Sequence, residues 1–200
     1  MDTSYYHALS ATIGVDVKKD SVQHSTAYTR TAVALHWIIA LLIAAGFTLG
    51  ATMTDLNISP RKLRHYSYHK WIGITVLGLV AIRLIWRLTH RVPLDEPMPR
   101  WQRIAAHGTH WLLYLLMIAT PIFGWLYSSA SGYPVVYLKL WQLPDLVSKN
   151  AHLAKVLVKV HGFLAWTLFY VVLLHVVAAL KHHFFDRDAT LKRMLPGRRP

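Results

Sequence analysis

The sequence contains no cysteine, and only 9 of its 200 residues are acidic. Without cysteine the chain forms no disulfide and has no thiolate ligands for zinc, an iron–sulfur cluster or a CxxCH cofactor attachment. Charged residues make up 16% of the chain, where a soluble domain carries about 25%, and 54% of the residues are hydrophobic. These shortages argue against a disulfide scaffold and a soluble domain, and they favour a membrane protein.

The charge that is present is mostly positive. Lysine and arginine number 22, and the formal net charge is +13. Such a balance raises nucleic acid as a partner. The basic residues, however, stand between long apolar runs and never form one stripe. The sequence therefore predicts no nucleic-acid binding.

Four apolar runs dominate the chain, at residues 31–53, 66–88, 104–130 and 156–185. Each is long enough to span a bilayer as a helix, and none alternates as a strand would. Pro121 is expected to kink the third helix. The sequence predicts an all-α, integral-membrane four-helix bundle over residues 27–197, preceded by a flexible polar N-terminal tail at residues 1–26.

Four spans place both chain ends on the same side of the membrane. Of the 22 basic residues, 14 lie in the tail, the second loop and the C-terminus, and 8 lie in the first and third loops. Since basic residues are enriched on the cytoplasmic side, both termini are predicted to be cytoplasmic.

Histidines recur inside the runs. Placing an ionisable side chain within a membrane costs free energy, so such residues suggest a function. His161 and His175 stand 14 residues apart, so they lie about 21 Å apart and on one helix face. Depth in the membrane pairs His69 with His161 and His36 with His175. On spacing alone, His107 or His110 can replace His36 as the partner of His175.

Two imidazole pairs at two depths predict two bis-imidazole haem sites, which pass single electrons. No carboxylate lies deep in a span, which disfavours a di-iron site, and the separation of about 21 Å disfavours one compact metal centre. Two readings outside electron transfer stay open. One is a histidine-rich zinc or copper transporter; the other is a structural anchor with packing histidines.

The arrangement resembles the bacterial cytochrome b561 family of di-haem membrane proteins over about residues 27–197. The matching pieces, in chain order, are Arg30…His36–Trp37, His69 with Arg83…Arg87, His110…Tyr114…Pro121…Gly124, His161…His175…His182–His183, and the closing Asp186…Thr190…Arg193–Met194–Leu195–Pro196.

The resemblance implies two non-covalent b haems in the bacterial inner membrane. It assigns His36 and His175 to the cytoplasmic-side haem, and His69 and His161 to the periplasmic-side haem. It also implies electron transfer to a membrane quinone, with ubiquinone expected, and makes superoxide a candidate periplasmic donor. No protein partner is required for this role. The rival within electron transfer is the di-haem anchor subunit of a hydrogenase or dehydrogenase.

Each of the remaining basic residues has two possible roles. Arg30, Arg83 and Arg87 suit haem propionates, or serve as cytoplasmic membrane anchors. His182 is placed to bond a quinone, or it caps a helix end together with His183. The first and third loops carry 8 basic residues against Asp55 and Asp145. That excess predicts either a funnel for a small anion or contacts with lipid headgroups.

Overall fold

Four long helices make up most of the computed structural model, which describes residues 27–90, 92–94 and 96–197. They are α2 (Arg30–Met53), α3 (Pro60–Thr89), α4 (Arg100–Ser131) and α5 (Ala151–Lys181), and a π-helical turn, His182–Asp186, continues α5. All four are long and apolar enough to cross a membrane. This confirms the all-α membrane bundle, and the expected tail at residues 1–26 lies outside the described part.

All four helices begin before the apolar runs, and polar side chains cap the starts of α3 and α5. The Ser59 hydroxyl accepts the Lys62 N–H at the start of α3, and the Asn150 side chain accepts the Leu153 N–H at the start of α5. Such caps satisfy N–H groups that have no partner within the helix. The first turns of α3 and α5 therefore project beyond the apolar spans. Helix α4 continues through Pro121 to Ser131.

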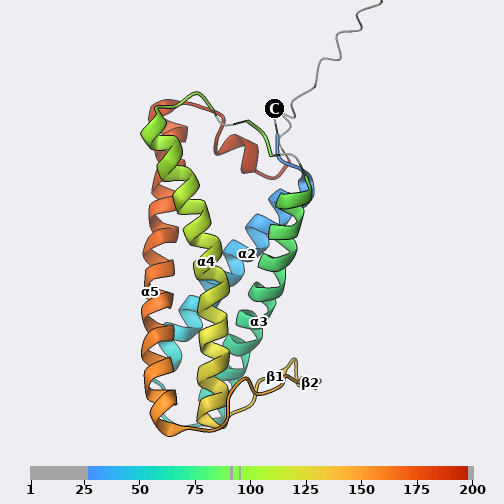
Figure 1. Cartoon of the computed structure of the whole chain (residues 1–200), viewed down its shortest axis with the longest axis vertical. Helices are drawn as coiled ribbons and strands as arrows, with labels where there is room; N and C mark the ends of the chain where they lie inside the picture. The colour runs from blue at the N-terminus through green and yellow to red at the C-terminus, as the bar shows by residue number, and fades with distance from the viewer. Residues whose placement is uncertain (1–26, 91, 95, 198–200) are drawn as a thin grey trace, which may run out of the picture.

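Neighbouring helices pack in chain order, α2 on α3, α3 on α4 and α4 on α5 (Figure 1). Helices α2 and α5 meet through aromatic side chains, since the Phe47 ring stacks on Phe169 at 4.6 Å and meets the edge of Trp166 at 5.1 Å. A buried apolar cluster fills the middle of the bundle, formed by Ile39, Val76, Val80, Leu113, Tyr114, Leu116, Met117 and Leu168. Many large apolar side chains point outward instead, as expected of lipid-facing helices.

The two ends of the bundle differ. At one, here called the hairpin end, the α4–α5 connection forms two short antiparallel strands, β1 (Val136–Tyr137) and β2 (Trp141–Gln142). At the other, the terminal end, residue 27 begins the described chain and the segment after α5 crosses toward α2 and α3 (Figure 1). The hairpin was not among the elements expected from the sequence.

Polar contacts hold the crossing segment in place. The Trp37 indole N–H donates to the Met194 carbonyl at 2.6 Å, beside the short 3-10 helix Lys192–Met194. The Arg193 guanidinium pairs with the Glu96 carboxylate at 2.7 Å and donates to the Leu94 carbonyl at 2.8 Å. The C-terminal segment therefore ties α2 and the α3–α4 connection together across the terminal end.

Candidate functional site

The imidazoles of His69 and His161 face each other near the hairpin end. Their ring centroids lie 6.0 Å apart, with the ring planes at 85°. His69 comes from α3 and His161 from α5. The structure thus brings together the first pair predicted from depth.

Each of these rings is fixed by a neighbouring helix. The His69 Nδ1–H donates to the Gly46 carbonyl at 2.8 Å, and the His161 Nδ1–H donates to the Thr120 carbonyl at 2.9 Å. A carbonyl partner at Nδ1 sets the tautomer and leaves Nε2 as the free lone pair. Both imidazoles are therefore oriented as metal ligands.

A glycine makes room for each ring, four residues after the carbonyl that the ring reaches. A Cβ atom on Gly50 would stand 3.1 Å from the His69 ring, and one on Gly124 would stand 2.9 Å from the His161 ring. The second contact is shorter than real Cβ atoms tolerate. We call these two positions the glycine notches, and they allow the imidazoles to lie against α2 and α4.

The second pair lies nearer the terminal end. The rings of His36 and His175 have centroids 6.2 Å apart and planes at 71°. His110 also approaches His175, with centroids 5.4 Å apart. Among the described residues, neither His36 nor His175 makes a side-chain hydrogen bond to a backbone carbonyl. This pair is therefore held less firmly than the pair at the hairpin end.

Both pairs have the dimensions that a shared metal requires. Two imidazoles that bind one metal ion from opposite sides, at about 2 Å per bond, hold their ring centroids about 6 Å apart. The buried Thr120 hydroxyl, beside the carbonyl that holds His161, has no hydrogen-bond partner. An unsatisfied buried hydroxyl is what a cofactor pocket leaves when its contents are removed. The residues present thus fit a metal-centred group.

Two of the predicted arginines lie beside the terminal-end pair. Arg83 donates to the Ala32 carbonyl at 2.7 Å, and its charge acts on both His36 and His175. Arg87 lies close enough to act on His110. The exposed Arg30 opens α2. Arg83 and Arg87 also line one pocket together with Tyr28, Thr29, Ala32, Trp86, His90, Val92 and Tyr114.

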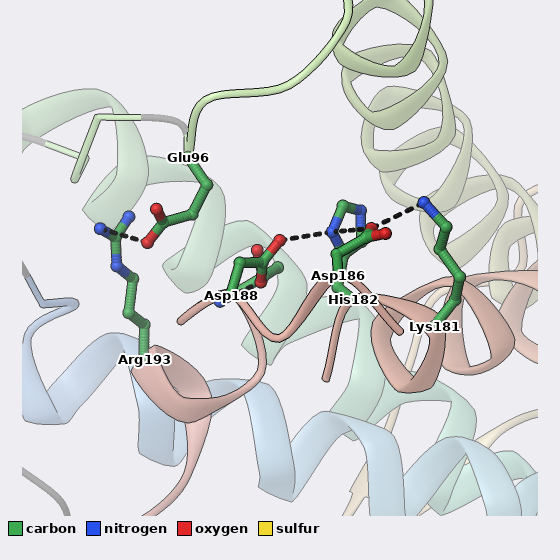
Figure 2. Close-up of polar contacts among 7 residues, drawn as sticks. Glu96, Lys181, His182, Asp186, Asp188 and Arg193 are labelled. Atoms are coloured by element: carbon green, nitrogen blue, oxygen red, sulfur yellow. Dashed lines mark hydrogen bonds and ion pairs between the residues drawn. The ribbon is translucent and has the colours of Figure 1, made fainter. Parts of the chain in front are cut away.

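His182 belongs to a polar cluster in the π-helical turn (Figure 2). Its Nδ1–H donates to the Asp188 carboxylate at 2.6 Å, and Asp186 lies 3.1 Å away. Lys181 pairs with Asp186 at 2.6 Å. The sequence placed His182 correctly near the helix end, but it gave no sign of the Asp188 partner.

Asp188 is held as an anion by its hydrogen bonds. Partial burial by itself raises the pKa of this carboxyl, but the Thr190 backbone N–H and hydroxyl and the His182 ring outweigh burial and lower the pKa. The Thr190 N–H donates to the second Asp188 oxygen at 2.8 Å. His182 therefore has a stable acceptor at Nδ1.

The bundle and the site together define a class of protein. It is a four-helix membrane protein with two imidazole pairs at different depths, which suit electron transfer through bound metal. The family model described as prokaryotic cytochrome b561 matches residues 27–197, and the chain belongs to that family. It is therefore a membrane b-type cytochrome, which binds haem and transfers electrons.

Curated relatives match this chain over most of its length and most of their own. It is 34% identical over 172 residues to "Cytochrome b561 homolog 2" of Escherichia coli (strain K12), covering 84% of this chain and 90% of the relative. It is 32% identical over 182 residues to "Probable superoxide oxidase CybB" of Yersinia pestis, covering 86% and 97%. It is 29% identical over 178 residues to "Cytochrome b562" of Cereibacter sphaeroides, covering 86% and 96%.

Proposed function

We propose that the chain carries single electrons across the bacterial inner membrane through two b haems, from a periplasmic donor to ubiquinone. The strongest support is the presence of two imidazole pairs at different depths. Their α5 members, His161 and His175, lie about 21 Å apart along the helix. In this proposal the hairpin end is periplasmic and the terminal end cytoplasmic. Bis-imidazole haem has no open iron position, so each site passes electrons rather than activating oxygen.

The imidazoles of His69 and His161 would hold one haem, and those of His36 and His175 would hold the other. His36 is preferred to His110 because its separation from His175 matches that of the other pair, at 6.2 Å and 6.0 Å. The 5.4 Å between His110 and His175 is short for rings on opposite sides of one iron. Arg83 and Arg87 are placed to pair with propionates at this end.

The proposed donor at the hairpin end is superoxide. A pocket between the end of α4 and the first turns of α5, before His161 in the chain, is lined by Tyr127, Ser131, Val158 and the two lysines Lys149 and Lys155. Positive charge at a site entrance raises the arrival rate of a small anion. Two other lysines at this end are engaged locally, since Lys62 donates to the Thr54 and Leu56 carbonyls and Lys70 donates to the Tyr133 and Pro134 carbonyls. One relative is also named as a probable superoxide oxidase.

Ubiquinone is the proposed acceptor at the terminal end. Two superoxide anions release two electrons and leave as two oxygen molecules, and these electrons with two protons reduce one quinone to quinol. His182 lies about 10 Å beyond His175 along the helix. Since Asp188 binds its Nδ1–H, His182 presents Nε2 toward a hydrogen-bond partner and is our candidate for contact with the quinone.

The first test is a dithionite-reduced minus air-oxidised visible spectrum of the purified protein, with the haem-to-protein ratio. We expect a sharp b-type alpha band and two haems per chain, without a co-purifying subunit. One haem per chain would remove one of the proposed pairs. Dependence of both haems on a second polypeptide would favour the anchor-subunit role instead.

The donor is tested by stopped-flow reduction of the haem with superoxide. Lys149→Gln and Lys155→Gln are expected to slow the reaction two- to tenfold at low ionic strength and to flatten its salt dependence. Lys192→Gln, at the opposite end, serves as the charge-matched control. An unchanged rate with unchanged salt dependence in both variants would exclude this entrance.

A further inference from the structure

We propose that the hairpin formed by β1 and β2 is a membrane-interface anchor, embedded in the headgroup region of the leaflet at the hairpin end. Its occupant is lipid, held against the exposed side chains of Leu138, Leu140 and Trp141. The proposed electron transfer does not use this surface.

The hairpin folds back along α3 rather than projecting away from the bundle. The Trp71 indole N–H donates to the Val136 carbonyl at 2.7 Å, and the Thr75 hydroxyl bonds the Tyr137 hydroxyl at 2.9 Å. Trp71 stands 11 residues after the start of α3 at Pro60, so the contact lies about 16 Å inside that helix end. Figure 1 shows the two strands beside α3, short of the end of the bundle. The Trp71 contact thus lies about 7 Å inside the apolar run of α3, which begins at residue 66.

The side chains at the tip are apolar and uncovered. The exposed fraction is 87% for Leu140, 72% for Trp141 and 48% for Leu138. Lys139 is the only charged residue between Tyr133 and Pro144. Aromatic rings with leucine and a single lysine suit the membrane interface, where aromatics sit at headgroup level and lysine extends its charge toward water.

The turn gives independent support. Leu138 and Lys139 adopt positive φ angles of 51° and 62°, and the Leu140 N–H donates to the Tyr137 carbonyl at 2.9 Å. Two successive positive φ angles are the pattern of a type I′ turn, which favours asparagine and glycine. A positive φ angle costs backbone energy at leucine and at lysine. In water, the side chains of Leu138 and Leu140 would also be exposed. Contact with lipid provides the compensation.

Lipid is favoured over a protein partner by continuity. The hairpin adjoins the face of α3 on which the exposed Tyr68 ring contacts Trp71, and the exposed Ile82 and Ile85 lie farther along the same helix. Open strand edges are not tolerated in the hydrocarbon core, so the headgroup region, where water and lipid polar groups satisfy them, is the depth that fits. Lys70 links this anchor to the site, since its ammonium donates to the Tyr133 and Pro134 carbonyls while its neighbour His69 is a site residue.

Single-cysteine spin labelling tests the anchor, because the natural chain has no cysteine. Leu140→Cys is labelled in the haem-loaded protein, in nanodiscs of phosphatidylethanolamine and phosphatidylglycerol. Accessibility to oxygen, which concentrates in lipid, is compared with accessibility to a water-soluble nickel chelate. Ile85→Cys is the lipid-facing control, and Asn57→Cys, in the α2–α3 loop, is the water-facing control.

We expect the oxygen-to-nickel accessibility ratio of the Leu140 label to lie between those of the Ile85 and Asn57 labels, and to be several-fold above that of the Asn57 label. A ratio equal to that of Asn57 would place the tip in water and overturn the proposal. Protection from both reagents, or dipolar broadening between labels, would show a protein partner or a second copy and would overturn it too. Trp141→Cys repeats the measurement at the neighbouring position.

Discussion

A single methyl group is enough to probe how the imidazoles are held. Gly124→Ala adds a Cβ atom 2.9 Å from the His161 ring, so the ring must shift and its hydrogen bond to the Thr120 carbonyl is weakened. We expect about 1–3 kcal/mol of destabilisation from overpacking, with loss of up to one haem of the proposed two. The measurement is the haem-to-protein ratio and the thermal midpoint.

The matched control for this variant is Gly162→Ala. Gly162 lies beside His161 in the same helix, and a Cβ atom there meets nothing within 4 Å. Both changes gain the same helix propensity. Equal haem content in the two variants would contradict the role assigned to the Gly124 notch.

The terminal-end ligand is decided by a second pair of variants. His36→Ala should remove about half of the haem, whereas His110→Ala should retain both haems with a small shift of the alpha band. The reason is geometric, since only the His36–His175 separation matches that of the His69–His161 pair. Pyridine haemochrome assays on both proteins check this; the reverse outcome would make His110 the ligand.

Helical periodicity and depth in the membrane predict which histidines meet, but they leave His107 and His110 as alternatives to His36, and His110 also approaches His175. Both depth-based pairs came together as predicted. The carbonyl partners could not be predicted, since Gly46 is 23 residues from His69 and Thr120 is 41 residues from His161. The identity of a hydrogen-bond acceptor across two helices depends on their packing, which spacing alone does not encode.

The segment after α5 is expected to be stabilised in a pH-dependent way by Asp188. Its Asp188 has a lowered pKa, so the stabilisation from this carboxylate is fully present above the ordinary value near 4 and is lost as the pH falls through the lowered value. We expect a spin label at Lys192→Cys to stay immobile from neutral pH to about pH 4 and to gain mobility below it.

Two variants separate the contributions to that transition. Asp188→Asn should make the label mobile at all these pH values. Glu96→Gln removes a second carboxylate that contacts the segment, through Arg193, and should leave the pH step in place. If the step disappears in Glu96→Gln but persists in Asp188→Asn, the assignment to Asp188 is wrong.

The four spans were predictable because apolar runs of this length have one stable form in lipid. Their starts were less predictable, since charged first turns such as Arg61, Lys62 and Arg64 look like loop in an apolar profile. The hairpin escaped prediction for a different reason. Leu138 and Lys139 are poor turn residues by composition, yet both have positive φ angles.

For the whole molecule, the proposed orientation places the hairpin end in the periplasm. Single cysteines at Asn57 and Lys192 test it with an impermeant maleimide on intact spheroplasts. We expect Asn57→Cys to react fully, and Lys192→Cys to react only after lysis, at least tenfold less before it. The opposite pattern would reverse the membrane orientation and the assignment of the two haems to their sides.

The carbonyl hydrogen bonds of His69 and His161 also bear on the order in which the protein takes up its cofactors. The hairpin-end imidazoles are anchored by carbonyls of α2 and α4, so they are in place before any cofactor arrives, whereas the His36 and His175 rings make no such bond among the described residues. Assembly should then be ordered. When apoprotein is titrated with haem, the first equivalent should fill the hairpin-end site, and His161→Ala should abolish this first, tighter phase while leaving the second.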